Sequence, residues 1–80
     1  MNIGEAVRER IIELCRERDI SINKLCSMSG VTQSTVNNIV SGRNNSATIS
    51  TIKKLCDGLG ITIQDFFNAS LFKDLDQEVE

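Results

Sequence analysis

Histidine is absent from this 80-residue sequence, and so are proline, tryptophan and tyrosine. Without histidine, the commonest general base is missing, and the Ser/His and Cys/His nucleophile pairs cannot form. We therefore expect no enzymatic activity. The sequence also gives no sign of a cofactor or of a small-molecule ligand.

Cysteine is scarce, and the three cysteines, Cys15, Cys26 and Cys56, include no Cys-x-x-Cys pair. A zinc site would need a carboxylate as its fourth ligand, so we expect no metal site. An odd number of separated cysteines fits reduced thiols that act as small buried hydrophobic side chains in a cytosolic protein. Redox sensing by Cys26 or Cys56 is a weaker hypothesis, because both lie at apolar positions of predicted helices.

Long hydrophobic runs are also missing, since no uninterrupted apolar run exceeds two residues. We therefore expect no membrane-spanning segment. Residues 1–19 alternate charged with aliphatic side chains, unlike the apolar block of a secretory signal peptide, so we expect no such peptide.

Acidic side chains are absent between residues 20 and 56, although the whole chain has a net charge of −2. This middle segment carries four cations: Lys24, Arg43, Lys53 and Lys54. Residues 57–80 carry six acidic side chains and one lysine. Because binding of a polyanion depends on the local field, the middle segment is the part that phosphate groups would approach.

Apolar residues repeat at steps of three and four, which predicts helices and no convincing strand. The first helix has one apolar stripe, and we expect its charged face to be solvent-exposed. Polar N-caps and glycines set the predicted boundaries. The five predicted helices cover residues 3–18, 21–28, 32–40, 48–59 and 62–67. We expect one all-α domain over residues 1–69 and a tail over residues 70–80 that is first apolar and then acidic.

The fourth predicted helix has an apolar series along it and glycines at its end. Ile49 begins an apolar series at helical spacing that continues through Leu59, and Gly58 and Gly60 are predicted to end the helix.

The start of each predicted helix has its own capping residue. Asn2 with Glu5 and Thr62 with Asp65 fit capping boxes, and single caps are expected at Ser21, Thr32 and Thr48.

The segment between residues 25 and 40 joins two short helices through a turn at Gly30. A steep crossing of two helices needs one turn residue in a conformation that glycine adopts without strain. It also needs a small side chain on the first helix where the second passes close, and Cys26 stands four residues before Gly30. Val36 and Ile39 are predicted to face inward, so the polar residues of the second helix are left outside.

This ordered set of residues resembles the phage-repressor-type (Cro/C1, or XRE) helix-turn-helix family. The matching positions are Cys26, Gly30, Val31, Thr32, Thr35, Val36, Ile39 and Gly42. The chain departs from the family pattern at Ala47, where proline is frequent. It also has no lysine or arginine in the second helix of the motif, residues 32–40. The resemblance implies a compact five-helix, lambda-repressor-like fold whose helices 2 and 3 form the helix-turn-helix.

The resemblance implies sequence-specific binding of double-stranded DNA by a cytoplasmic, nucleoid-associated regulator of bacterial or phage type. The protein is then a transcriptional regulator, most simply a repressor, that reads the major groove with helix 3, about residues 32–41. The residues expected at base edges are Gln33, Ser34, Asn37 and Asn38. Those expected at the DNA backbone are Thr32, Thr35, Asn23, Lys24, Arg43, Asn44 and Asn45. At most one of Lys53 and Lys54 is expected to face DNA.

Apolar residues near the C-terminus exceed what a five-helix core requires. They are Phe66, Phe67, Leu71, Phe72 and Leu75, and we expect them to form a homodimer interface. An alternative from a different class is an antitoxin or adaptor whose C-terminal apolar segment binds a protein partner.

Overall fold

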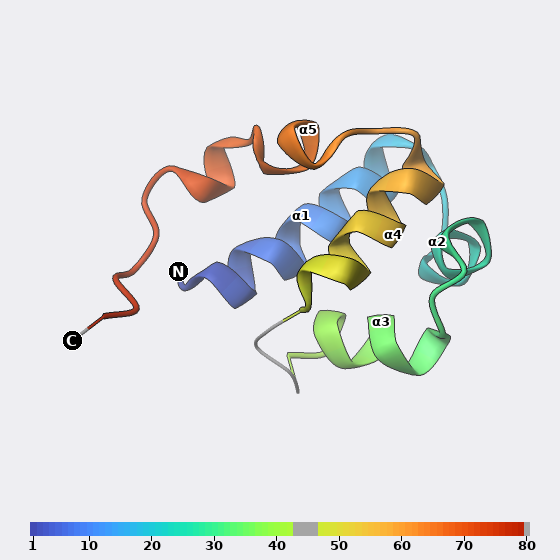
Figure 1. The fold of residues 1–80 in the computed structure, drawn as a ribbon, viewed down its shortest axis with the longest axis horizontal. Coiled ribbons are helices and arrows are strands. Elements are labelled where there is room, and N and C mark those ends of the chain that lie inside the picture. Colours follow the sequence, from blue (N-terminus) through green and yellow to red (C-terminus); the bar gives the residue numbers. More distant parts are fainter. Residues whose placement is uncertain (43–46, 80) are drawn as a thin grey trace.

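The computed structural model describes residues 1–42 and 47–79, which form five α-helices and one short 3-10 helix (Figure 1). In chain order these are α1 (Ile3–Glu17), α2 (Ile22–Ser29), α3 (Gln33–Val40), α4 (Ile49–Leu59), α5 (Ile63–Phe67) and the 3-10 helix η1 (Ser70–Phe72). The described ranges contain no β-strand. The predicted all-α, five-helix fold is confirmed.

Each α-helix begins at a polar residue whose side chain accepts a hydrogen bond from a backbone N–H three residues later. The five N-caps are Asn2, Ser21, Thr32, Thr48 and Thr62, as predicted. At the starts of α1 and α5, Glu5 and Asp65 complete the expected capping boxes. These bonds satisfy backbone donors that a helix leaves unpaired at its first turn.

One hydrophobic core joins all five α-helices. α2 packs against α4, while α1 packs against α3 and η1. The core residues are Val7, Ile11, Leu14, Cys15, Leu25, Cys26, Val36, Ile39, Ile52, Leu55, Cys56, Leu59 and Phe66. In Figure 1, α3 and α5 lie at opposite edges of the molecule. None of the helices in the described ranges combines the length and the hydrophobicity that crossing a bilayer requires.

The N-terminal turn of α4 differs from the prediction. Ile49 was expected to begin the apolar stripe that faces the core, but this first residue of α4 is 70% exposed. The stripe that faces the core begins one turn later, at Ile52. Helical spacing alone does not show where a helix leaves the core.

The sequence predicted that Gly58 helps to end α4, but Gly58 lies within this helix. A Cβ atom at this position would lie 2.8 Å from the Cα atom of Ser29, at the crossing of α4 and α2. Glycine is therefore required here for space. The chain leaves α4 at Gly60, whose φ of +71° is in the left-handed region that glycine adopts without strain.

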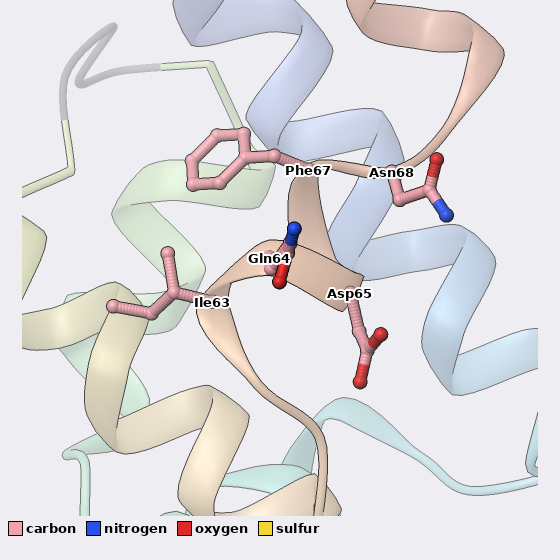
Figure 2. A pocket seen from close by; sticks show the side chains of 5 residues that line it. All are labelled: Ile63, Gln64, Asp65, Phe67 and Asn68. Carbon is pink, nitrogen blue, oxygen red and sulfur yellow. The ribbon is translucent and has the colours of Figure 1, made fainter.

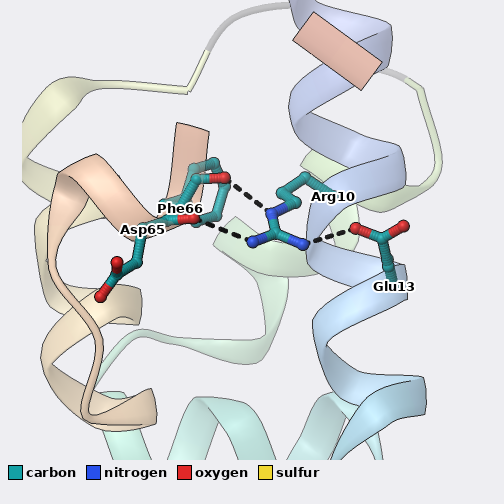
Figure 3. A network of polar contacts seen from close by, with 4 residues as sticks. All are labelled: Arg10, Glu13, Asp65 and Phe66. Atoms are coloured by element: carbon teal, nitrogen blue, oxygen red, sulfur yellow. Dashed lines mark hydrogen bonds and ion pairs between the residues drawn. The ribbon is translucent and has the colours of Figure 1, made fainter. Parts of the chain in front are cut away.

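Arg10 corrects the expectation that the charged face of α1 is entirely solvent-exposed. Its side chain is buried (the residue is 9% exposed), and Nε donates to the carbonyl oxygen of Phe66 at 2.7 Å (Figure 3). Nη2 donates to the carbonyl oxygen of Asp65 at 2.9 Å, and Nη1 pairs with Glu13. Arg10 thereby satisfies carbonyls at the C-terminal end of α5 and ties that helix to α1.

The burial of Phe66 shows that the prediction was wrong to place this residue in a dimer interface. Its side chain is fully buried within the protomer, where its ring packs edge-to-face against Phe67 at a centroid distance of 5.0 Å. The ring of Phe72 in η1 lies 4.9 Å from that of Phe67, and both rings pack against the core. Leu71 and Leu75 are half-buried. The aromatic residues near the C-terminus therefore contribute to the protomer's own core.

We expect Gly58→Ala to lower the free energy of unfolding by about 1 kcal/mol, the difference between a packing cost and a gain in helix propensity. Alanine improves helix propensity by about 1 kcal/mol, but its Cβ meets the backbone of Ser29, and overpacking of this kind costs about 1–3 kcal/mol. Urea denaturation measures the difference. Lys54→Ala, at an exposed position of the same helix, serves as the control and should change stability by less than about 0.5 kcal/mol. A Gly58→Ala protein as stable as the wild type would contradict the close approach.

Candidate nucleic-acid interface

Gly30 forms the turn between α2 and α3. It ends α2 with a φ of +69°, and its N–H donates to the carbonyl oxygen of Cys26 at 2.9 Å. A Cβ atom here would meet nothing within 4 Å, so the requirement for glycine comes from the backbone conformation and not from space. Thr32 then caps α3, and the two helices share one continuous turn of only three residues.

Cys26 occupies the position where α2 and α3 approach each other. Its side chain is buried, and its Sγ atom lies 4.0 Å from the carbonyl oxygen of Thr32. The small side chain predicted four residues before the glycine is therefore at the contact between the helices. A larger residue at this point would push the start of α3 outward.

The two faces of α3 differ sharply. Val36 is fully buried and Ile39 nearly so, while Val40 is half-buried against the core. The side chains on the other face are exposed and uncharged, and they are Gln33, Ser34, Asn37 and Asn38. These are the four residues that the sequence placed at base edges, and we call them the outer face of α3.

Three hydroxyl groups meet at the start of α3. The Oγ1 atom of Thr32 accepts from the backbone N–H of Thr35 at 3.3 Å and lies 2.8 Å from the Oγ1 atom of Thr35. The Oγ atom of Ser34 lies 3.4 Å away from the same Thr32 atom. The Thr32 and Thr35 hydroxyls are thus already engaged within the helix start.

The predicted backbone contacts on α2 are accessible. Asn23 and Lys24 are exposed in its first turn, and the N–H of Lys24 donates to the Ser21 cap at 3.0 Å. The predicted contacts Arg43, Asn44 and Asn45 lie outside the described residues. On α4, Lys53 and Lys54 are both exposed, and Lys53 forms an ion pair with Asp57.

Arg8 is a cation near this surface that the sequence analysis did not single out. Its Nη1 atom lies 3.1 Å from the position that a Cβ of Gly42 would occupy, just beyond the C-terminal end of α3. Its side chain is about one-third exposed and lies 3.6 Å from Glu9. No sequence signal marks this residue, because its place depends on how α1 packs against α3.

A pocket of about 510 Å³ lies elsewhere on the molecule, on α5 (Figure 2). Its lining residues all come from α5 and its C-cap, and they are Ile63, Gln64, Asp65, Phe67 and Asn68. Since α5 and α3 lie at opposite edges of the molecule in Figure 1, this pocket is separate from the outer face of α3.

All three cysteines are buried as free thiols. Burial raises the pKa of each thiol above its ordinary value, and for Cys15 the nearby Cys26 adds to the increase. Arg18 opposes the increase at Cys15, but burial has the larger effect. Raised pKa values and burial both suppress the thiolate that reacts with oxidants.

Comparison with known proteins gives consistent results. Residues 10–70 match the sequence profile of the Cro/C1-type HTH DNA-binding domain. A solved structure, the crystal structure of the prophage Lp1 protein 11, is 38% identical to this chain with a TM-score of 0.80. The similarity covers 94% of this chain and 100% of that one. A search of curated proteins found no significant match.

We expect the three thiols to react slowly with a thiol-specific reagent at pH 8 in the folded protein, at a rate limited by unfolding. Since each thiol holds its proton more tightly when folded, the free energy of unfolding should also fall as pH rises through the ordinary thiol pKa. The absorbance of the released product of a thiol reagent measures the labelling rate, and urea titrations at two pH values measure the free energy of unfolding. A thiol that reacts as fast as free cysteine would show that it is accessible.

Proposed function

Because this chain belongs to the Cro/C1-type helix-turn-helix DNA-binding family, we propose that it is a transcriptional regulator. It binds duplex DNA with α3 in the major groove. The observation that supports this most directly is the outer face of α3, which is exposed and polar above the buried Val36 and Ile39. The simplest mode of action is repression, in which the bound protein blocks a promoter on the nucleoid.

The proposed contacts follow the arrangement of α2 and α3. Gln33 is the first candidate for a base edge, because its amide both donates and accepts, and Ser34, Asn37 and Asn38 are the others. The proposed backbone contacts are Thr32, Thr35, Asn23, Lys24, Arg43, Asn44 and Asn45. We add Arg8, which lies beside Gly42 at the end of α3 and carries a charge suited to a phosphate.

The charge distribution supports this orientation. The acid-free segment from residue 20 to residue 56 contains α2, α3 and most of α4. The acidic residues that follow are Asp57 on α4, Asp65 on α5 and the rest in the tail, which leaves the helices beyond α5 (Figure 1). Phosphates would therefore be attracted to the acid-free segment that contains α2 and α3 and repelled from the acidic tail.

We infer that two copies bind DNA together, because one protomer offers few cations and two-fold dimers double the contacts. Phe66 takes no part, since it is buried in the core. An apolar groove of about 180 Å³ lies between the N-terminal ends of α1 and α4 and is lined by Ile3, Val7, Ile49, Ile52 and Phe67, among others. With Ile49 largely exposed at its rim, this groove is the surface we propose for the dimer.

The alternative function, an antitoxin or adaptor that binds a protein through its C-terminal apolar segment, has less support. Phe66 is buried, and Phe67 and Phe72 pack against the protomer's own core. We propose that residues 1–69 act as the DNA-binding domain and that residues 70–80 are a tail whose first part stabilises it.

We expect Lys24→Ala to weaken DNA binding equally for all sequences and to reduce the slope of log affinity against log salt by about 0.9, as for one lost phosphate contact. A mobility-shift titration at several salt concentrations gives both values. Lys73→Ala removes an equally exposed lysine after η1 and is the matched control. If both variants reduced the slope of log affinity against log salt by the same amount, the change in net charge and not the position of Lys24 would explain the effect.

We expect Ile49→Ser to shift the protein toward monomers, because it replaces the most exposed apolar side chain at the rim of the groove. Sedimentation equilibrium measures the mass directly. The control is Ile63→Ser, at an exposed isoleucine on α5 that does not line the groove. A wild-type protein that is monomeric both alone and on DNA with two half-sites would contradict the dimer.

A further inference from the structure

We propose that the base pairs contacted by the outer face of α3 are A·T pairs, read in the major groove, so that the centre of each half-site is A·T. This inference rests on the proposed function and deepens it by naming the class of DNA sequence. It comes from the kinds of side chain on α3 and from which of their polar groups remain free.

The outer face of α3 carries amides and hydroxyls but no charge. In the major groove, an asparagine or glutamine amide pairs with adenine by accepting from N6 and donating to N7. Guanine presents two acceptors, which arginine or lysine match, and cytosine presents a donor, which carboxylates match. Residues 32–42 contain no lysine, arginine, aspartate or glutamate. The helix therefore has bidentate partners for adenine and none of the charged partners of guanine or cytosine, while the hydroxyl of Ser34 can bond to any base edge.

Hydrogen bonds within the protein decide which side-chain groups of α3 are free to contact bases. One of the Thr32 and Thr35 hydroxyls donates to the other at the helix start, so one O–H of the pair remains for a phosphate, and the methyl groups of both residues are suited to a thymine methyl. The amides of Gln33, Asn37 and Asn38 have no hydrogen-bond partner among residues 1–42 and 47–79, and all three side chains are exposed. These three amides are therefore available to bases without breaking a bond that we observe.

The spacing of the three amides sets the length of the segment that is read. Asn37 follows Gln33 by four residues, which places both on one side of the helix, and Asn38 lies one residue further along, on the adjacent part of the exposed face. The rise from Gln33 to Asn38 is about 7.5 Å at 1.5 Å per residue. At about 3.4 Å per base pair, this spans about three consecutive pairs. We expect a short A·T core in each half-site.

A preference for A·T pairs has a second possible origin, because A·T-rich DNA also has a narrow minor groove that attracts cations. Inosine·cytosine pairs separate the two origins. Such a pair resembles G·C in the major groove but A·T in the minor groove, since inosine lacks the guanine N2 amino group. A protein that reads adenine in the major groove should reject it, whereas one that senses the minor groove should accept it.

The experiment starts from duplexes that the wild-type protein selects from a random pool. Affinities are then measured for the selected duplex and for versions in which each core A·T pair is replaced by G·C or by I·C. We expect both replacements to weaken binding, by about tenfold at the best-read position. Selected sites with a G·C core, or undiminished binding to I·C, would overturn the inference. Absence of saturable binding to any duplex would instead overturn the proposed function as well.

A matched pair of variants links the preference to α3. Gln33→Arg places a guanine-reading side chain on the outer face, and we expect selection to shift from adenine to guanine at one position of the half-site. Gln64→Arg adds the same charge at an exposed glutamine on α5, at the opposite edge of the molecule, and should leave the selected sequence unchanged (Figures 1 and 2). An unchanged selection by Gln33→Arg would contradict the assigned role of this residue.

Discussion

The burial of Val36 and Ile39 is the interaction on which the proposed DNA-binding surface depends. A helix of eight residues is too short to be stable alone in water, so α3 exists only because the core holds it. Burying these two side chains contributes roughly 1.5–3 kcal/mol each, and the Thr32 cap adds about 1 kcal/mol. Since the apolar residues face inward, the polar residues between them are presented outward. The fold of α3 and the proposed binding surface are therefore two consequences of one packing arrangement.

The rest of the molecule fixes the direction in which that helix points. Gly30 permits the change of chain direction, Cys26 allows α2 and α3 to approach, and Gly58 allows α4 to pack closely on α2. At the other edge, Arg10 ties α5 to α1 through backbone carbonyls. The buried charge of Arg10 is balanced by Glu13 and by these carbonyl oxygens, so it costs less than an isolated buried cation would.

Features that depend on a few neighbouring residues could be predicted from the sequence, and features that depend on distant ones could not. The five N-caps, the turn at Gly30 and the inward-facing residues of α3 follow from local rules of capping and periodicity, and the structure confirms them. The burial of Arg10, the close approach at Gly58 and the position of Arg8 result from contacts between helices. Phe66 shows the same limit, because composition indicates surplus apolar residues but not which surface they cover.

We propose that α3 presents free amide groups to the bases of duplex DNA. The most direct test is an NMR titration of ¹⁵N-labelled protein with a duplex that it has selected, following the side-chain amide signals. We expect the signals of Gln33, Asn37 and Asn38 to shift strongly, while those of Gln64 and Asn68 on the far edge stay in place. Shifts confined to α5, with the amides of α3 unmoved, would contradict it.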